Sequence, residues 1–172
     1  ASREEGRTVV EEAPKKSSGS NGVVERAVGE VEGQMRAILI AFEDRIGEAI
    51  RPSEPIAQFI PEFAAYVLNR MMIGKDGKTA MERVKGKKIT MPGLEFGEKL
   101  LWKIPKGQKM AKMKSRWEYG IFVGVRRRSG EFWVVDKEGE VRAVRSVKRV
   151  PVGERWGKDN RRWVKGVPWN RY

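Results

Sequence analysis

The sequence predicts an α+β chain with a helical first half, a small β-rich domain and a basic tail. Apolar residues recur at three- and four-residue steps up to about residue 73, whereas short runs rich in Val, Trp, Phe and Tyr begin at about residue 94. The charge divides at the same place, since residues 1–95 hold 15 Lys+Arg and 15 Asp+Glu, while residues 96–172 hold 21 and 8. The whole net charge of +13 therefore lies in the second half, which indicates a polyanionic partner, nucleic acid before membrane.

The first helix is predicted over about residues 22–45, after a short candidate strand at residues 7–12 and a polar loop. Ser20 or Asn21 precedes the helix as a candidate N-cap. Its apolar residues form one stripe over about five turns. The stripe consists of Val24, Val28, Val31, Met35, Ile38 and Phe42.

Two shorter helices follow in the same half. Residues 56–73 are apolar on more than one side of a helix and are expected to be well buried. Residues 79–85 begin with the capping-box pattern Thr79-x-x-Glu82, and Gly86 is expected to end that helix. Residues 1–92 are therefore predicted to be one mainly helical segment.

Five β-strands are predicted between residues 93 and 152. The runs EKLLWKIP, RWEYGIFVGV, GEFWVVD, EVRAVRS and VKRVP are separated by turns that contain Gly or Lys. Five such strands suit a small barrel of the SH3 type or a similar one. Aromatic residues are expected to fill its core, with a cage for a methylated lysine as the alternative. These residues are Trp102, Trp117, Tyr119, Phe122 and Trp133.

The last segment, residues 153–172, is basic and has no regular period. Its aromatic residues are Trp156, Trp163, Trp169 and Tyr172. It is predicted to be an extended or partly disordered tail. Its tryptophans suit either stacking on unpaired bases or docking on another subunit, and the sequence leaves both open.

The chain contains neither Cys nor His. Disulfides and zinc sites of the usual ligand types are therefore excluded, as are Cys–His and Ser–His nucleophile pairs. Any metal must be a hard cation on oxygen ligands, with Mg²⁺ and Mn²⁺ the obvious candidates. No run of about 18 apolar residues and no basic-then-apolar leader exists, so neither a membrane span nor a secretory signal is expected.

Three stretches in the same order resemble integrases of the retroviral type, in particular those of copia-like retrotransposons. SNGVVER, residues 20–26, resembles the polar loop and helix start that carry the last acidic residue of that family. AAYVLNRMMIGKDGKTAMERVKGKK, residues 64–88, is similar to its buried helix, glycine turn and Thr-x-x-Glu-Arg segment. PGLEFGEKLLWK, residues 92–103, resembles the passage from the catalytic core into a β-rich C-terminal region. The resemblance covers about residues 7–150.

The resemblance implies the helical C-terminal part of a ribonuclease-H-like integrase core, followed by an SH3-like barrel. In such a core three carboxylates hold two divalent ions, Mg²⁺ or Mn²⁺, that promote phosphodiester cleavage and strand transfer. Glu25 matches the third carboxylate, as catalytic residue and metal ligand, whereas Glu4, Glu5, Glu11 and Glu12 do not match the other two. The chain alone is therefore expected to hold no metal tightly and to be inactive. The alternative for Glu25 is a first-turn acid favoured by the helix dipole.

Nucleic-acid contacts are expected from basic or polar residues in both halves. The candidates in the first half are Lys15, Lys16, Asn21 and Arg26. Those in the second half are the loop lysines Lys106, Lys109, Lys112 and Lys114 and the turn arginines Arg126, Arg127 and Arg128. A hairpin turn lets arginine side chains project toward phosphates. The alternatives are solvated surface charges and, for Asn21, a helix cap.

The function that follows is DNA integration by a longer parent protein, of which this chain is a fragment. The expected partners are DNA, as element ends and as target, the remainder of the integrase polypeptide, and further copies in a homo-oligomer. Because integration takes place in the nucleus, the parent is expected there. Before import it is expected in a virus-like particle or in the cytoplasm. Two alternatives stay open: a non-catalytic nucleic-acid or chromatin-binding remnant of a transposon, and a module that assembles through its apolar helix and Trp-rich tail.

Overall fold

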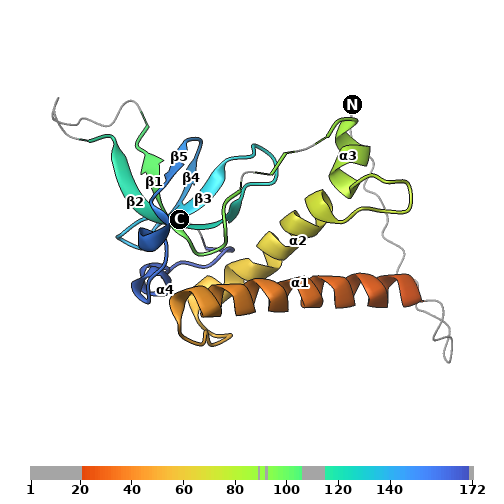
Figure 1. The fold of residues 1–172 in the computed structure, drawn as a ribbon, viewed down its shortest axis with the longest axis horizontal. Coiled ribbons are helices and arrows are strands. Elements are labelled where there is room, and N and C mark those ends of the chain that lie inside the picture. Colours follow the sequence, from red (N-terminus) through yellow and green to blue (C-terminus); the bar gives the residue numbers. More distant parts are fainter. Residues whose placement is uncertain (1–20, 89, 92, 106–114, 171–172) are drawn as a thin grey trace, which may run out of the picture.

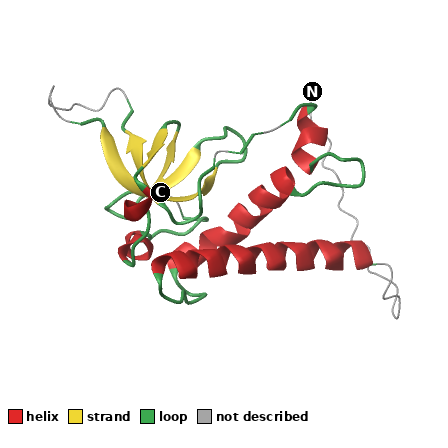
Figure 2. Cartoon of the chain, viewed as in Figure 1, coloured by secondary structure: helices red, strands yellow, loops and turns green. Residues whose placement is uncertain are grey.

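The computed structural model describes residues 21–88, 90–91, 93–105 and 115–170. Helices form one part of the molecule and a curved sheet lies beside them (Figure 1; Figure 2). Helix α1 spans Gly22–Ile46, which confirms the helix predicted over residues 22–45. The strand predicted at residues 7–12 lies outside the described residues.

The second predicted helix is divided into two elements. A 3-10 helix, η1, spans Pro55–Phe59, and α2 spans Ile60–Met71. Pro61 has no N–H to donate to the carbonyl of Ala57, so one α-helix does not run unbroken through this point. Helices α1 and α2 approach each other near the sheet and diverge toward the end where α1 begins (Figure 1). None of the helices in the described ranges is long and apolar enough to cross a membrane.

The third helix, α3, spans Ala80–Lys85 and begins with the predicted capping box. The Glu82 N–H donates to Thr79 Oγ1 at 3.2 Å, and the Thr79 N–H donates to Glu82 Oε2 at 2.8 Å. These two hydrogen bonds satisfy backbone groups that the first helical turn leaves without partners. Gly86 ends the helix with φ 68°, a left-handed conformation that glycine adopts at little cost.

The second half forms a five-stranded antiparallel sheet with the order β4-β3-β2-β1-β5. The strands are β1 (Lys99–Lys103), β2 (Trp117–Val125), β3 (Phe132–Val135), β4 (Val141–Val144) and β5 (Val147–Arg149). Strands β1 to β4 follow one another as a meander, and β5 returns to pair with β1. The five predicted strands are confirmed. They form an open sheet where a small barrel was predicted, since β4 and β5 do not pair with each other within the described residues.

The helices and the sheet share one hydrophobic core. Phe42 of α1 contacts Phe96 edge to face, with ring centroids 5.8 Å apart. Phe63 of α2 lies 5.6 Å from Phe96 and 5.6 Å from Phe122 of β2. All four rings are buried. Because aromatic rings supply much of the apolar area in a core, this chain of contacts joins the two predicted segments, 1–92 and 93–152, into one packed body.

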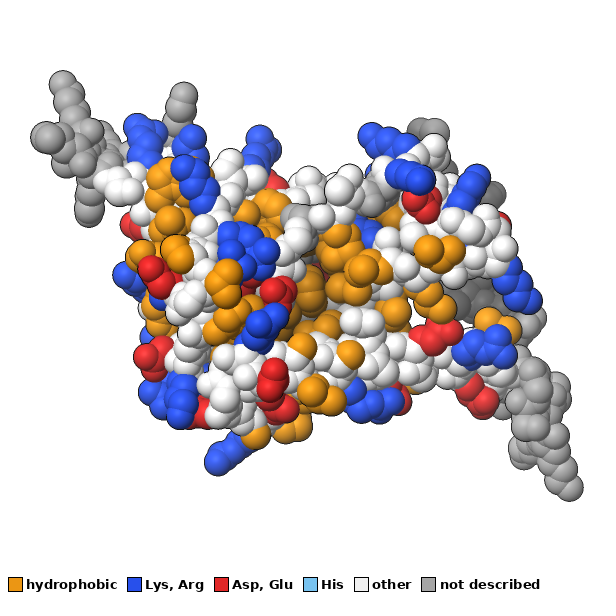
Figure 3. Space-filling model, in the orientation of Figure 1, with side chains coloured by type: hydrophobic (Ala, Val, Ile, Leu, Met, Phe, Trp, Pro, Cys, Tyr) orange, Lys and Arg blue, Asp and Glu red, His pale blue; other side chains and the backbone are white. Residues whose placement is uncertain are grey.

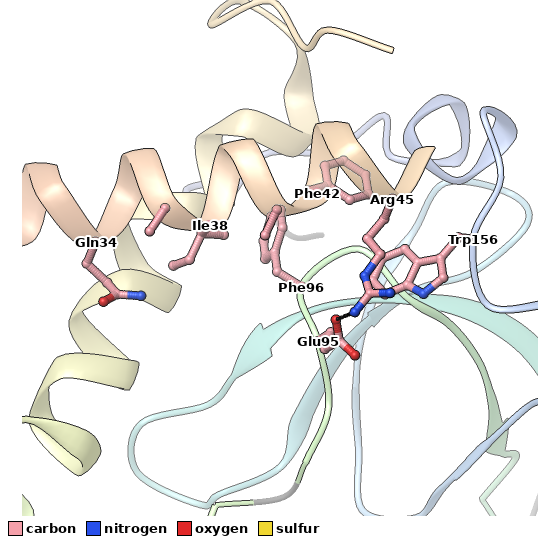
Figure 4. A pocket seen from close by; sticks show the side chains of 9 residues that line it. Gln34, Ile38, Phe42, Arg45, Glu95, Phe96 and Trp156 are labelled. Carbon is pink, nitrogen blue, oxygen red and sulfur yellow. Dashed lines mark hydrogen bonds and ion pairs between the residues drawn. The ribbon is translucent and has the colours of Figure 1, made fainter. Parts of the chain in front are cut away.

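Ion pairs border this core where α1 meets the sheet (Figure 4). Arg45 lies over the ring of Trp156, 5.6 Å from its centroid, and its Nη2 is 3.1 Å from Glu95 Oε2. Behind them, Arg149 holds the fully buried Glu98 through two nitrogens, with Nη2 2.6 Å from Oε2. A buried carboxylate is stable only when it is paired and hydrogen-bonded, and Arg149 supplies both.

The tail was predicted to be extended or partly disordered, but the structure shows two short helical elements in it. Element η2 spans Val152–Glu154, and α4 spans Asp159–Trp163. Asn160 is buried, and its Nδ2 donates to the carbonyl oxygens of Gly97 at 3.0 Å and Arg155 at 2.9 Å. The tail is therefore held against the sheet by a hydrogen-bonded buried amide, which an extended tail would leave in water.

A second set of contacts joins the tail to the helical half. Arg161 Nη2 lies 2.7 Å from Glu48 Oε2, and Arg161 Nη1 lies 3.2 Å from Glu54 Oε1. The same guanidinium donates to the carbonyl of Ala49 at 3.1 Å. Since Arg161 is four-fifths buried, with 20% of its side chain exposed, these charge-assisted bonds are little screened by solvent.

Candidate nucleic-acid interface

Glu25, the predicted catalytic and metal-binding carboxylate, lies exposed in the first turn of α1. Its N–H donates to the carbonyl of Asn21 at 2.9 Å, which closes the first turn. The described part of the chain contains no group of three or more Asp, Glu, His or Cys side chains that could hold a metal ion. The three-carboxylate set that the resemblance implies is therefore not found among these residues.

Asn21 and Arg26 lie at the same end of α1 and are both exposed. Asn21 occupies the N-cap position, but its side chain makes no capping hydrogen bond. This end of α1 points away from the sheet (Figure 1). The structure therefore separates Asn21, Glu25 and Arg26 from the turn arginines. The other predicted contacts, Lys15, Lys16, Lys106, Lys109, Lys112 and Lys114, lie outside the described residues.

The predicted hairpin turn connects β2 to β3 and spans residues 126–130, here called the arginine turn. The Arg126 N–H donates to the carbonyl of Glu131 at 2.7 Å, and the Gly130 N–H donates to the carbonyl of Arg126 at 2.9 Å. Gly130 has φ 73°, which glycine tolerates in a tight turn. This geometry presents three consecutive arginines at the tip of a rigid hairpin.

The three arginines are not equivalent. Arg126 Nη1 lies 3.1 Å from Glu131 Oε2, so its charge is partly neutralised. Arg127 and Arg128 are exposed and form no ion pair within the described part of the chain. These two side chains are therefore the ones that can meet phosphate oxygens without first losing a carboxylate partner.

Glu131 organises the base of the arginine turn. Its carboxylate accepts hydrogen bonds from Ser129 Oγ at 2.7 Å, Arg145 Nε at 3.2 Å and Arg126 Nη1 at 3.1 Å. The hydrogen bond from Ser129, followed by those from the two arginines, lowers the pKa of Glu131 below its ordinary value. The carboxylate is therefore charged at neutral pH and holds the turn in one shape.

A hollow of about 360 Å³ opens beside the arginine turn. It is lined by Glu62, Arg126, Arg127, Arg128, Trp133, Pro168 and Trp169. Trp169 is 73% exposed, so a flat apolar surface lies next to the guanidinium groups of Arg127 and Arg128, which form no ion pair within the described residues. Such a combination suits contact with the sugar–phosphate backbone of a nucleic acid.

The predicted core aromatics divide into two groups. Trp102, Phe122 and Trp133 are buried, with 4%, 1% and 6% exposure, which confirms their predicted place in the core. Trp117 is only half-buried, and Tyr119 is 37% exposed, so the core prediction is wrong for Tyr119. The reason is the position of the two rings along β2: its first three residues are exposed or half-buried, whereas residues 120–125 are buried on both sides of the strand, so the core does not reach Trp117 and Tyr119.

A second basic region surrounds α3, and sequence reasoning missed it. Lys and Arg side chains gather over the sheet and again around α3, with an apolar surface between them (Figure 3). A hollow of about 600 Å³ at α3 is lined by Asp76, Gly77, Lys78, Glu82, Arg83, Gly86, Lys87 and Lys88. The equal totals of acids and bases over residues 1–95 conceal this local excess. Counting charges over windows of about one helix would have found it.

The comparisons with known protein families, curated proteins and solved structures give no match for this chain. Its function is therefore argued from its own residues. The structure brings Arg126, Arg127 and Arg128 together with Trp169, a neighbour that the sequence prediction did not place there.

Proposed function

We propose that this chain binds DNA, mainly through phosphate contacts, at the arginine turn and the sheet beside it. The observation that carries the proposal is the position of Arg127 and Arg128, which form no ion pair within the described residues and lie in a hydrogen-bonded hairpin turn next to the exposed Trp169. Phosphate contacts supply most of the sequence-independent affinity of proteins for nucleic acid.

The distribution of ion pairs supports the same proposal. Carboxylates of the second half bind chiefly to arginines that hold the fold, as Glu98 does with Arg149 and Glu131 does with Arg126 and Arg145. Few acids remain to neutralise the other cations of this half, where 21 Lys+Arg face 8 Asp+Glu. A surface of this kind attracts a polyanion at low ionic strength and releases it as salt rises.

We further propose that the chain is part of a copia-like retrotransposon integrase, with DNA integration as the activity of the longer parent. The support is the resemblance of residues 20–26, 64–88 and 92–103, together with a helix that presents Glu25 in its first turn. The meander β1 to β4 and the return of β5 to β1 are compatible with an SH3-like domain. In the parent, which would act in the nucleus, Glu25 would be one ligand of Mg²⁺ or Mn²⁺.

By this proposal the chain alone is a DNA-binding protein without integrase activity, because one carboxylate holds Mg²⁺ poorly. The direct test is an assay of cleavage and strand transfer on the purified chain with Mg²⁺ or Mn²⁺. Activity that is abolished in Glu25→Gln would contradict the proposal for the isolated chain.

DNA binding is tested by the affinity of the full chain for a 20-base-pair duplex over a range of salt concentrations. We expect log K to fall linearly with log salt, and the slope of Arg127→Gln/Arg128→Gln to be less steep by about 2, because each phosphate contact contributes about 0.9. Arg51→Gln, in the loop after α1, is the matched control and should leave the slope nearly unchanged. Absence of salt-dependent binding at low ionic strength would overturn the proposal.

A further inference from the structure

Rings and ammonium groups lie side by side at the end of the sheet where β2 begins, here called the lysine–aromatic strip; it consists of Trp117, Tyr119 and the lysines around them. Trp117 and Tyr119 lie two residues apart on β2 and therefore share a face. Their cross-strand neighbours on β1 are Lys103, opposite Trp117, and Leu101, opposite Tyr119. Lys148 of β5 pairs with Leu101 from the other side.

Each ring of the strip is flanked by lysines. Lys148 Nζ lies 4.4 Å from the centroid of Trp117, and Lys103 Nζ lies 6.0 Å from it. Lys99 Nζ and Lys137 Nζ both lie 5.4 Å from the centroid of Tyr119. The strip continues to α4, because Lys137 Nζ is also 5.9 Å from the ring of Trp163.

The lysines of the strip are not neutralised. Within the described residues, no carboxylate forms an ion pair with Lys99, Lys103, Lys137 or Lys148. The lysine that does form one there is Lys158, with Glu48. Lys103, Lys137 and Lys148 are exposed, so their ammonium groups can reach a ligand in solvent. Because the carboxylates of the fold pair mainly with arginines, this face stays positively charged.

We propose that the lysine–aromatic strip binds single-stranded nucleic acid, with bases stacked on Trp117 and Tyr119 and phosphates held by the flanking lysines. Rings two residues apart on a strand are separated by about 6.8 Å. Successive bases of a duplex strand rise by about 3.4 Å, and their faces are already covered by neighbouring bases. Two neighbouring bases can occupy the two rings only when they are unstacked, which selects a single strand over a duplex.

The lysines that now cover the rings do not prevent stacking. An exposed cation–π contact changes an equilibrium by about two- to fivefold, whereas stacking of a base on an aromatic side chain changes it by about five- to 150-fold. A base therefore displaces the ammonium group from the ring face, and the lysine is then free to meet the adjacent phosphate. The strip is a different surface from the arginine turn, so this proposal does not depend on duplex binding there.

The test compares Tyr119→Ala with Tyr119→Phe in the full chain, using fluorescence anisotropy of labelled oligothymidylate, oligouridylate and a hairpin duplex. Tyr119→Phe keeps the ring and should bind single strands like the unmodified chain. Tyr119→Ala should bind them at least fivefold more weakly, while duplex affinity changes less than twofold. Arg127→Gln/Arg128→Gln should show the reverse pattern, with duplex binding lost preferentially.

A second variant keeps the test decisive if Tyr119→Ala does not fold. Lys103→Gln/Lys148→Gln should reduce the salt slope for single strands by about 1.4, since each contact to a single strand contributes about 0.7. Equal single-strand affinity in Tyr119→Ala and Tyr119→Phe would overturn the proposal, as would an equal loss for single strands and duplex.

Discussion

The two halves of α1 share one apolar stripe but differ in what covers it. In the C-terminal half, Ile38, Phe42 and Ile46 are buried against α2 and the sheet. In the N-terminal half, Val24 and Val28 remain 64% and 51% exposed. Helical periodicity therefore shows which side of a helix is apolar, but it does not show how much of that side the chain itself buries.

The same division separates the two candidate sites. Glu25 lies on the uncovered half of α1, and the described residues contain no group of three or more Asp, Glu, His or Cys side chains that could hold a metal there. The arginine turn lies on the sheet, which the covered half of α1 supports through the shared core. The comparison indicates that the core supports the sheet that carries the arginine turn, whereas the surroundings of Glu25 are open among the described residues.

The largest expected effect contrasts Phe42→Ala with Val28→Ala. Loss of the Phe42 ring leaves a cavity at the centre of the core and should lower the free energy of unfolding by about 3–5 kcal/mol. Val28→Ala, on the uncovered half, should change it by no more than about 0.5 kcal/mol. Urea unfolding measures both, and equal effects would show that the N-terminal half of α1 is also covered in solution.

A glycine pair sharpens the contrast. A Cβ at Gly97 would overlap the ring of Phe42, and Gly97 has φ 78°, so Gly97→Ala should destabilise the chain by about 2–3 kcal/mol. Gly29 lies within α1 with open space around it, and Gly29→Ala should stabilise the helix by about 0.5–1 kcal/mol. Melting temperatures that move in the same direction for both variants would contradict the account.

The contacts of the tail should contribute less. Arg161→Met removes the partner of Glu48 and Glu54 and should cost about 1–2 kcal/mol, because the pairs are partly buried. Arg162→Gln removes an exposed pair with Asp159 and should cost about 0–0.5 kcal/mol. Thermal unfolding separates the two, and an unchanged melting temperature in Arg161→Met would show that the tail does not fasten the helices to the sheet.

The smallest effect is a dependence on acid pH. The pKa of Glu131 is lowered in the folded chain, so its stabilising contribution is complete above the unfolded value of about 4.3 and is lost as pH falls through the lowered folded value. A carboxyl-detected NMR titration should place the midpoint below that of an ordinary Glu. Arg145→Gln should raise it, and a midpoint at the ordinary value in the unmodified chain would contradict the hydrogen bonds to Ser129, Arg126 and Arg145.

The sequence predicts the features of this fold that depend on neighbouring residues. The stripe of α1, the Thr79–Glu82 capping box and the five strands follow from spacings of two to four residues. The ordered tail does not, because Asn160 finds its partner Gly97 63 residues away.

The candidate sites divide in the same manner. A hairpin at Arg126 to Gly130 follows from local composition, whereas its position beside Trp169 depends on how the tail packs. The exposure of Trp117 and Tyr119 depends on how far along β2 the core extends, and composition alone does not fix that point.

The most direct measurement is amide hydrogen exchange of the full chain with and without a duplex oligonucleotide at low ionic strength. The account predicts that DNA slows exchange at residues 126–130 and in the strands that flank them, and leaves residues 22–33 unchanged. Protection confined to residues 22–33 would contradict it and would place the DNA at the Glu25 end of α1.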